Sequence, residues 1–544
     1  MKRLLSHPAL LLSLFVAMTV IPLLGNAYLF DWDEVNFAEC AREMIVTGDY
    51  LHPRIDYEPF WEKPPLFFWL QALAMNLFGI NEFAARLPNA IVGIVTVAML
   101  VIIGKRWVDS TFGMLWGLVW IGSLLPQFYM HTGLIDPLFN LLMVASAICA
   151  LESITSKNAI LLACSGLLLG LAVLTKGPIA LALVGIPLLA LWLRCAGWKH
   201  TLRDAGIVAV IAVLPFTLWL ASDRSSWGQW FMQSFLDYQL RLLTTGDAGH
   251  HGPLYYHIAV LLLGCFPASW LALKAYRPKW RIEDLADASF TFAVMLVVVV
   301  VIFSIVQTKI IHYSSLAYFP LTFFAAQVLY RWWYSPNKAI VFLIAAGSII
   351  LGILFILTPI ILANRPLLEA LARDTFARSI VQTAVPQWRG IEWAAGALVL
   401  SATLTAFIAF RWSPRSAVVI LLLSNALGVS AFLRVVAPRI QDFTQRELVE
   451  FCRRYAQSDV ILHPVGFKTY VHLFYGRRKF SQSPPGNSIS RSQWEAYLLD
   501  GPIRTDVIFI AKRVKAGDLL RRKDFVQLDD PNSAWLFLLR PAKR

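Results

Sequence analysis

The sequence predicts an α-helical membrane protein that crosses the bilayer many times and carries a small α/β domain at its C-terminal end. Of the 544 residues, 58% are hydrophobic and only 15% are charged, which is too little charge to cover a soluble protein of this size. Several apolar runs exceed the roughly 18 residues that a membrane-crossing helix needs. In residues 436–544 the composition changes, because short apolar runs typical of strands alternate with charged runs typical of helices.

Thirteen apolar runs within residues 1–435 are candidate membrane spans, and we treat this region as one transmembrane domain. The first run lacks a small-x-small cleavage site, so we interpret it as a retained anchor and not as a signal peptide. The run 64–80 is apolar but short, and we expect a helix at the membrane interface; if it crossed, the count would be fourteen. The thirteen candidates are 8–30, 84–104, 110–129, 136–154, 158–175, 177–194, 204–222, 252–273, 288–307, 311–330, 339–362, 391–410 and 416–435.

Basic residues occupy every second connection between these spans, which predicts the orientation of the chain. Because cytoplasmic connections are enriched in Lys and Arg, we expect the N-terminus in the cytoplasm. The long connections 31–83 (the outer loop), 223–251 and 363–390, with the C-terminal domain, then lie on the opposite, outer face. This distribution explains much of the net charge of +14, so we expect no nucleic-acid partner. The basic connections contain Lys105, Arg106, Lys157, Arg194, Lys199, Arg203, Lys274, Arg277, Lys279, Arg281, Arg331, Lys338, Arg411 and Arg415.

Acidic residues stand at two points where predicted spans meet the outer face. Asp33 and Glu34 follow the first span. They serve either as a general base or cation partner at the membrane surface, or as the acidic start of a surface helix that runs to about Met44. Asp136 precedes a proline at the start of the fourth span, which is typical of a helix N-cap, although a cap can also serve a site.

Four cations lie in outer connections, where the positive-inside rule does not expect them. Each alone is compatible with anchoring at lipid headgroups, since long cationic side chains reach out of an apolar surface to the interface. Together they indicate an anionic ligand at the outer membrane surface, most simply a lipid phosphate. The set consists of Lys63, Lys176, Arg241 and Lys309, the last followed by His312 and Tyr313.

A metal site is a weaker hypothesis. His250 and His251 with a carboxylate such as Glu62 could hold a divalent ion, but their spacing matches no specific template, and surface histidines are the simpler interpretation. The six cysteines form no CxxC pair, so they predict neither a disulfide framework nor a thiolate metal site.

A series of short motifs follows these charged residues along the chain. In order they are Asp33-Glu34, Ala41-Arg42-Glu43-Met44, Gly48-Asp49-Tyr50, Lys63-Pro64-Pro65, Asp136-Pro137-Leu138, Leu174-Thr175-Lys176-Gly177-Pro178, and Lys309 with His312-Tyr313. Over about residues 8–330 this series resembles the bacterial C-type (GT-C) integral-membrane glycosyltransferases, which include the aminoarabinose transferases and relatives of the protein O-mannosyltransferases. The C-terminal domain, with residues 465–470, gives no firm link to the aminoarabinose enzymes in particular.

The resemblance implies an enzyme of the bacterial inner membrane whose site faces the periplasm. It would move a sugar from a polyprenyl-phosphate donor to a lipid acceptor, such as lipid A, or to a protein, with inversion at the anomeric carbon. In that frame the catalytic candidates are Asp33, Asp136 and Glu34. The groups implied to bind the donor phosphate are Lys63, Arg241, Lys176, Lys309, His312 and Tyr313.

Two other function classes remain open from the sequence. A transporter or flippase for such lipids would use the same cations to guide a headgroup, but transporters place polar groups near the membrane centre, and here they gather at one face. A structural membrane protein would leave the outer cations and the acidic loop without a common cause. The acceptor also stays open: a hydroxyl needs a base, whereas a phosphate arrives ionised and Asp33 would only position it.

Overall fold

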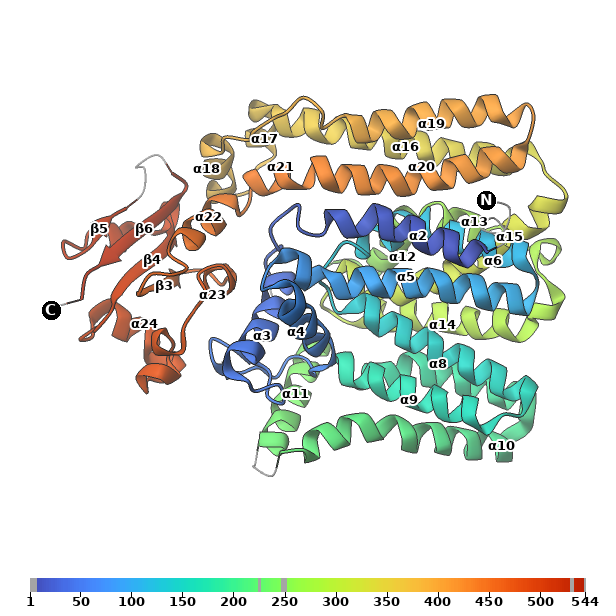
Figure 1. The fold of residues 1–544 in the computed structure, drawn as a ribbon, viewed down its shortest axis with the longest axis horizontal. Coiled ribbons are helices and arrows are strands. Elements are labelled where there is room, and N and C mark those ends of the chain that lie inside the picture. The colour runs from blue at the N-terminus through green and yellow to red at the C-terminus, as the bar shows by residue number, and fades with distance from the viewer. Residues whose placement is uncertain (1–6, 224–226, 246–251, 529–532, 543–544) are drawn as a thin grey trace.

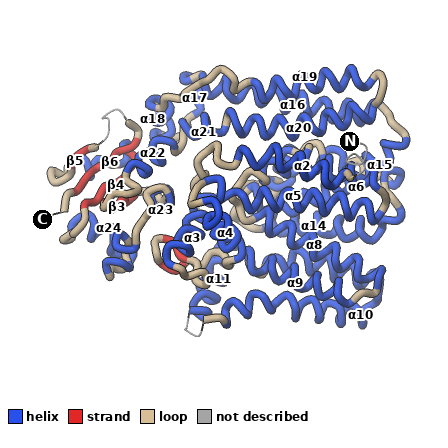
Figure 2. The backbone as a smooth tube through the Cα atoms, in the orientation of Figure 1, coloured by secondary structure: helices blue, strands red, loops and turns tan. Residues whose placement is uncertain are grey.

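The computed structural model describes residues 7–223, 227–245, 252–528 and 533–542, and it confirms a helical bundle with a small α/β domain at one end. Figure 1 shows the long helices running side by side and the domain beyond their ends. Strands are confined to this domain and to one short hairpin in the outer loop (Figure 2). The long bundle helices are α5 (Glu82–Trp107), α8 (Asp136–Ser156), α9 (Ala159–Lys176), α10 (Ile179–Ala221), α14 (Ala286–Ile305), α15 (Tyr318–Tyr334), α16 (Lys338–Ala363), α19 (Ala394–Phe410) and α20 (Pro414–Val435).

The predicted number of spans is not confirmed. Within the described residues, seven helices are long and apolar enough to cross a membrane. Several predicted spans are divided in the structure, because turns and 3-10 segments interrupt runs whose composition is uniformly apolar. The divided runs are 8–30, with α2 (Pro8–Val20); 110–129, with α6 (Ser110–Ile121) and α7 (Leu124–Tyr129); 252–273, with α12 (Tyr256–Gly264) and α13 (Ala268–Ala272); and 311–330, in which η5 (Ile311–Ala317) precedes α15.

One helix combines two predicted spans. α10 covers the runs 177–194 and 204–222, and it is interrupted at Gly197, whose φ of 71° is a left-handed value that residues with a Cβ rarely adopt. The far end of α10 returns to the outer loop, because the indole nitrogen of Trp219 donates a hydrogen bond to the carbonyl of Leu51 at 3.0 Å. The two halves therefore correspond to the two predicted spans.

The outer loop forms a platform between the bundle and the domain (Figure 1). It contains α3 (Asp33–Thr47), the hairpin strands β1 (Arg54–Ile55) and β2 (Glu58–Pro59), and α4 (Leu66–Phe78). Gly48 ends α3 in a left-handed conformation, as is common for a helix C-terminus. The apolar run 64–80 thus contains a helix of 13 residues, which is shorter than a membrane span.

The C-terminal domain holds a four-stranded sheet in the order β3-β4-β6-β5. β3 (Val460–Val465) pairs in parallel with β4 (Asp506–Lys512), whereas β6 (Trp535–Arg540) is antiparallel to both β4 and β5 (Val526–Gln527). The remaining elements include α21 (Ala437–Asp442), α22 (Arg446–Arg454), α23 (Val471–Phe474), α24 (Arg491–Asp500) and α25 (Gly517–Leu520). α23 packs against α3, so the domain rests on the platform.

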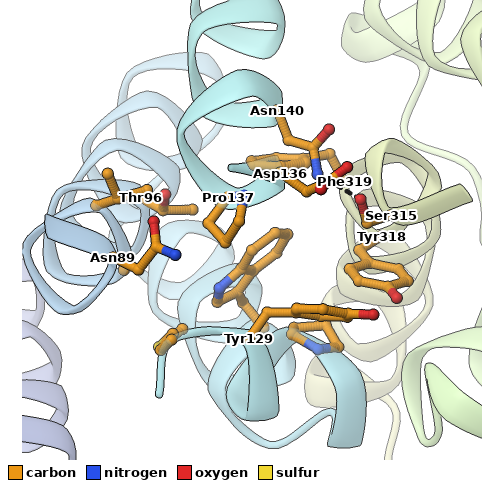
Figure 3. Close-up of a pocket in the computed structure, with 14 residues that line it drawn as sticks. Asn89, Thr96, Tyr129, Asp136, Pro137, Asn140, Ser315, Tyr318 and Phe319 are labelled. Carbon is orange, nitrogen blue, oxygen red and sulfur yellow. Dashed lines mark hydrogen bonds between the residues drawn. The ribbon is translucent and has the colours of Figure 1, made fainter. Parts of the chain in front are cut away.

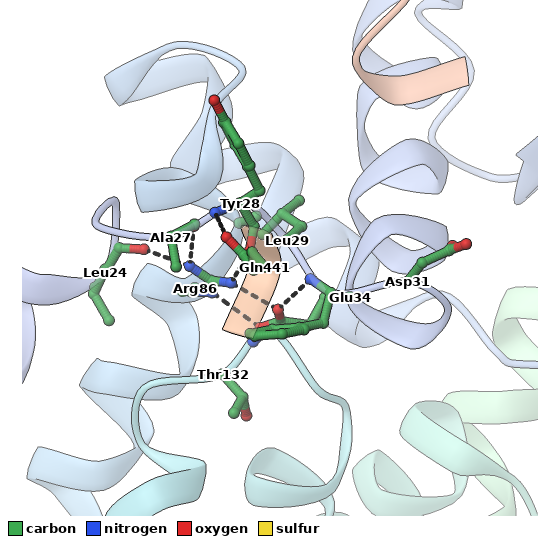
Figure 4. A network of polar contacts seen from close by, with 12 residues as sticks. Leu24, Ala27, Tyr28, Leu29, Asp31, Glu34, Arg86, Thr132 and Gln441 are labelled. Atoms are coloured by element: carbon green, nitrogen blue, oxygen red, sulfur yellow. Dashed lines mark hydrogen bonds and ion pairs between the residues drawn. The ribbon is translucent and has the colours of Figure 1, made fainter. Parts of the chain in front are cut away.

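A buried ion pair fixes the entry to α3 (Figure 4). The guanidinium of Arg86, from α5, donates to both carboxylate oxygens of Glu34 at 2.9 and 2.7 Å. The same guanidinium binds the carbonyls of Leu24, Ala27 and Tyr28. Glu34 also accepts bonds from two backbone amides, those of Phe30 at 2.9 Å and Gly133 at 2.5 Å. These contacts tie the end of the first helical segment, the start of α3 and the α7–α8 connection to one charge pair.

The C-terminal domain holds the same segment from the other side. Gln441 binds both backbone groups of Tyr28, accepting from its amide at 2.9 Å and donating to its carbonyl at 2.7 Å. Gln445 donates to the carbonyl of Leu29 at 2.7 Å, and the hydroxyl of Tyr475 accepts from the amide of Leu29 at 2.7 Å. Residues 28–31 are therefore clamped between the bundle and the domain.

Replacing Arg86 with methionine is expected to lower the free energy of unfolding by about 3–5 kcal/mol, because it leaves the buried Glu34 carboxylate without its counter-charge. Thermal unfolding in detergent, followed by circular dichroism, measures the effect. The matched control is Arg106→Met on the same helix, whose side chain is 60% exposed and pairs with Glu152, so its cost should stay within about 1 kcal/mol. Equal unfolding temperatures for the two variants would contradict a structural role for the Arg86 pair.

Candidate active site

A cavity of about 770 Å³ opens where the platform, the bundle and the C-terminal domain meet. It lies at the end of the bundle where α8 begins and α9 ends, and we call it the Asp33 cavity. Its floor comes from the start of α3 and from η5, and α11 (Trp227–Thr244) and the C-terminal domain form its sides. The polar residues that line it are Asp31, Asp33, Glu34, Asn36, Glu62, Thr132, Tyr238, Arg241, Thr308, His312, Tyr313, Lys468 and Tyr470.

Four residues predicted from separate motifs come together at this cavity. Nε2 of His312 lies 3.7 Å from a carboxylate oxygen of Asp33 and 3.8 Å from one of Asp136. The second oxygen of Asp136 accepts a hydrogen bond of 2.5 Å from Nζ of Lys176. The Asp33 carboxylate is 42% exposed, whereas that of Asp136 is 4% exposed. Of the two acids, Asp33 is therefore the one that a ligand in the cavity can reach.

The predicted N-cap role of Asp136 is wrong. The residue at the cap position is Ile135, and Asp136 is the first residue of α8 with no side-chain capping bond. Its carboxylate turns instead to Lys176 at the end of α9, because a buried carboxylate is stabilised more by a cation than by one backbone amide. The Lys176 ammonium also lies 5.1 Å from the ring centre of Tyr313, an attractive cation–π arrangement.

Two further cations near the cavity contact the same aromatic ring. Nζ of Lys63 lies 5.1 Å and the guanidinium of Arg241 lies 5.2 Å from the ring centre of Tyr238. Burial lowers the pKa of Lys63, and the neighbouring charge of Lys176 lowers it further against the opposing effect of nearby carboxylates. The cavity thus concentrates positive charge at the side facing α11.

Two predicted site residues have structural contacts instead. The ammonium of Lys309 donates to the carbonyls of Phe303, Ser304 and Val306 at 3.0, 2.6 and 2.6 Å, so it neutralises the C-terminal end of α14 and does not line the Asp33 cavity. Glu34 reaches the cavity wall but is 4% exposed and held by Arg86. Successive residues on a helix point about 100° apart, so Asp33 can face the cavity while Glu34 faces the bundle.

The C-terminal domain contributes residues that the sequence did not identify as part of the site. Lys468 and Tyr470 line the cavity, and the ammonium of Lys468 stands 4.8 Å from the ring centre of Trp32. The Tyr470 amide lies 3.4 Å from an oxygen of Asp31 as a long hydrogen bond. More than 430 residues separate these partners in the sequence, as in the Asp31–Tyr470 pair at a separation of 439, so no local pattern predicted them.

A second, smaller cavity of about 30 Å³ lies inside the bundle beside Asp136 (Figure 3). Polar side chains line it, among them Asn89, Thr96 and Asn140, and Asn140 donates to the hydroxyl of Ser315 at 2.8 Å. This volume suits one or two water molecules. Asp136 therefore stands between the Asp33 cavity and a polar chamber in the bundle.

The metal hypothesis cannot be placed on the structure, because His250 and His251 lie outside the described residues. Across residues 7–223, 227–245, 252–528 and 533–542, no three His, Cys, Asp or Glu side chains are grouped closely enough to hold a metal ion.

Comparison with known proteins agrees with the resemblance indicated by the motifs. Residues 62–219 match the family model described as dolichyl-phosphate-mannose-protein mannosyltransferase. The chain is 29% identical over 314 residues to an undecaprenyl phosphate-alpha-4-amino-4-deoxy-L-arabinose arabinosyl transferase 2 of Proteus mirabilis, covering 56% of each protein. It is 28% identical over 377 residues to such a transferase of Edwardsiella ictaluri, covering 66% of each. The matched regions thus span less than two thirds of these relatives.

The fold is shared with a solved structure over nearly the whole chain. The crystal structure of ArnT from Cupriavidus metallidurans bound to undecaprenyl phosphate superposes with a TM-score of 0.77 at 17% identity, covering 98% of each chain. The apo structure of the same ArnT gives a TM-score of 0.72 at 18% identity, covering 97% of each. The predicted fold, a polytopic helical bundle with a small C-terminal α/β domain, is therefore confirmed.

Replacing Lys309 with methionine is expected to destabilise the fold by about 3 kcal/mol, because one buried and two part-buried carbonyls lose a charged donor. Thermal unfolding of the purified protein in detergent measures the loss. Lys338→Met, at an exposed position at the start of α16, serves as the control and should leave the unfolding temperature within a few degrees. A Lys309 variant as stable as the control would show that these carbonyl contacts contribute little.

Proposed function

We propose that this protein is a membrane glycosyltransferase that moves a sugar from a polyprenyl-phosphate donor to a lipid or protein acceptor. The observation that carries the proposal is the grouping of Asp33, Asp136, His312 and Lys176 beside a cavity with further cations along one side. The similarity to undecaprenyl-phosphate aminoarabinose transferases supports the same donor class and favours a lipid A-type acceptor. Enzymes of this kind need an acid or base and a cationic site for the leaving phosphate.

In this proposal the reaction is one displacement at the anomeric carbon. An acceptor oxygen forms the new bond while the bond from the sugar to the phosphate oxygen breaks, and the electron pair stays on the polyprenyl phosphate. Asp33 meets the acceptor at the exposed side of the cavity. It removes the proton of a hydroxyl acceptor, or it positions a phosphate acceptor that is already ionised. A single displacement inverts the anomeric configuration.

The cations act on the departing phosphate in this proposal. Negative charge on that phosphate grows as the bond to the sugar breaks, so donors already placed around it lower the barrier. Lys63 and Arg241, which both lie against the ring of Tyr238, are the groups that we assign to this role. Asp136 holds Lys176 by a buried ion pair and keeps His312 between the two carboxylates. These three are positioning or charge-supplying groups around the reacting atoms.

The placement of the charges favours an enzyme over a lipid transporter. The four grouped charges beside the Asp33 cavity come from the first residues of α3 and α8, the last residue of α9 and the 3-10 segment η5, so they stand at one end of the bundle and not at its centre. The opposite end holds the basic connections, such as Lys105 and Arg106 at the end of α5 and Arg411 after α19. By the positive-inside rule we infer a cytoplasmic N-terminus, with the cavity and the C-terminal domain in the periplasm of a bacterial inner membrane.

Asp33→Asn is expected to lower sugar transfer by about 10²- to 10⁴-fold, because the amide retains the shape of the carboxylate but cannot accept a proton. The measurement is transfer from a synthetic polyprenyl-phosphate sugar by purified protein in lipid, with folding and donor binding checked in parallel. Asp31→Asn changes a carboxylate on the same cavity and should cost less than about tenfold. Equal turnover by Asp33→Asn and wild type would move the catalytic assignment to Asp136.

The pH dependence of sugar transfer should follow the protonation of Lys63. Because the pKa of Lys63 is lowered, its ammonium loses a proton at a lower pH than an ordinary lysine, and the rate should fall on the alkaline side of the profile at that lower pH. Lys63→Arg, whose guanidinium stays charged, should extend the alkaline side to higher pH. Lys63→Gln, which has no charge to lose, should be slower than wild type at every pH where wild-type Lys63 is protonated, and the difference should shrink once Lys63 deprotonates. An alkaline limb that stays in place in Lys63→Arg would exclude Lys63 as its source.

A further inference from the structure

A third cavity, of about 720 Å³, lies at the end of α3, whereas the Asp33 cavity lies at its start. It occupies the junction between the end of α3, the α4–α5 turn and the segment that follows α23, and we call it the arginine cavity. Four of its nine lining residues are cationic. The full lining is Arg42, Val46, Thr47, Tyr57, Ile80, Arg477, Arg478, Lys479 and Phe480.

Two of these cations serve the fold and fix the shape of the cavity. Arg42 makes a bidentate pair with Glu39, with both contacts at 2.7 Å, and donates to the carbonyl of Arg478 at 3.1 Å. Arg478 is 3% exposed, donates to Asp56 at 3.0 Å and binds the carbonyl of Leu462 at 3.0 Å. The guanidinium groups are therefore held in place before any ligand arrives.

The same residues leave donors unused. In the described part of the chain, neither Nη2 of Arg478 nor Nη1 of Arg477 has a hydrogen-bond partner, and both atoms lie buried within the cavity wall, so the exposed atoms of these guanidinium groups are the ones that meet a ligand. A guanidinium donor buried without an acceptor is costly, so such donors are normally paired. The other end of Arg477 donates to the carbonyl of Ile80 at 2.6 Å, which directs this side chain along the cavity wall.

The lining of the arginine cavity carries more positive than negative charge. Among the described residues no carboxylate forms an ion pair with Arg477, and Lys479 has only a distant partner, Asp459 at 3.9 Å. Burial lowers the pKa of Arg477, and the charge of Arg42 lowers it further against the opposing effect of Glu39 and Glu82. Burial, with the charge of Glu39, raises the pKa of Glu43 well above its usual range. An anion in the cavity would offset this imbalance.

The position of the cavity suits a group at a membrane surface. Ile80 lies two residues before α5, one of the helices long and apolar enough to cross a membrane, so the cavity lies level with the start of that helix. Beside it, at the end of α4, Leu77 and Phe78 are 69% and 54% exposed. Exposed apolar side chains next to buried cations match a lipid whose chain lies along α4 and whose headgroup reaches the arginines.

We propose that the arginine cavity binds a phosphate group, carried by an anionic lipid headgroup or present as soluble phosphate. Arg477 and Arg478 supply planar guanidinium donors, which suit the oxygens of a phosphate, and Lys479 adds a point charge at the rim. The site is separate from the donor site proposed at the Asp33 cavity, because the two cavities share no lining residue and lie at opposite ends of α3. A ligand here bridges α3, the α4–α5 turn and the C-terminal domain.

The test measures binding and not sugar transfer, so its failure is distinct from failure of the proposed function. Full-length protein in detergent is titrated with phosphatidylglycerol, with neutral phosphatidylcholine and with inorganic phosphate, and native mass spectrometry counts the bound molecules. The double variant Arg477→Gln/Lys479→Gln should bind the anionic probe at least about tenfold more weakly than wild type, since each substitution removes a charged donor. The matched control is Arg521→Gln/Lys523→Gln, which removes the same charge from exposed positions of the same domain.

The outcomes separate the two sources of phosphate. If the double variant loses binding of phosphatidylglycerol alone, the ligand is a lipid headgroup. If it loses binding of inorganic phosphate equally, the ligand is a soluble anion. Both results support the site. Binding of both probes that is the same in the double variant and the control overturns it. If the double variant fails to fold, Lys479→Gln alone, with a side chain 48% exposed, and Arg477→Lys, which keeps the charge but loses the fork, repeat the comparison.

Discussion

The ion pair between Arg86 and Glu34 is the contact on which the remainder of the site depends. It places a charge from the first long helix of the bundle against a charge from the outer loop, in a region where neither can be solvated. Because a buried charge must be matched, the start of α3 has little freedom to move relative to α5. Because Asp33 is the neighbour of Glu34, its backbone is held in place by the same contact, and its side chain faces the Asp33 cavity. One member of the acidic pair therefore serves the fold so that the other can meet a ligand.

The charges around the cavity are stabilised in two ways. Asp136 and Lys176 neutralise each other, so this buried pair adds little net charge, although it orients both side chains. Lys63 and Arg241 lie against the ring of Tyr238, an attractive cation–π arrangement. In a cavity with restricted access to water, such charges act more strongly on a ligand than they would at an open surface. The arrangement is suited to a ligand that gains negative charge.

The sequence predicted the bundle, the C-terminal domain and much of the Asp33 cavity, because hydropathy and misplaced charges are local signals. Asp33, Asp136, Lys176 and His312 each interrupt apolar sequence next to a span, and the structure brings them together. The sequence could not predict which of the outer cations would bind the carbonyls at the end of a helix instead of lining the cavity. Lys309 does so at the end of α14. The division of runs such as 252–273 also escaped prediction, since their composition is equally apolar on both sides of the break.

The clamp on residues 28–31 gives the order in which the site can be completed during synthesis. The Arg86 pair joins residues 52 positions apart and can form as soon as the first helices have left the ribosome. Gln441 meets Tyr28 only after a further stretch of chain, since 413 positions separate them. The interval from Arg86 to Gln441 is 441 − 86 = 355 residues, which at synthesis rates of about 5–20 residues per second takes roughly 20–70 s. Through that time a nascent chain holds its acidic loop but has no cavity wall from Lys468 and Tyr470, so a ribosome that stalls before the last domain leaves a chain with an incomplete cavity.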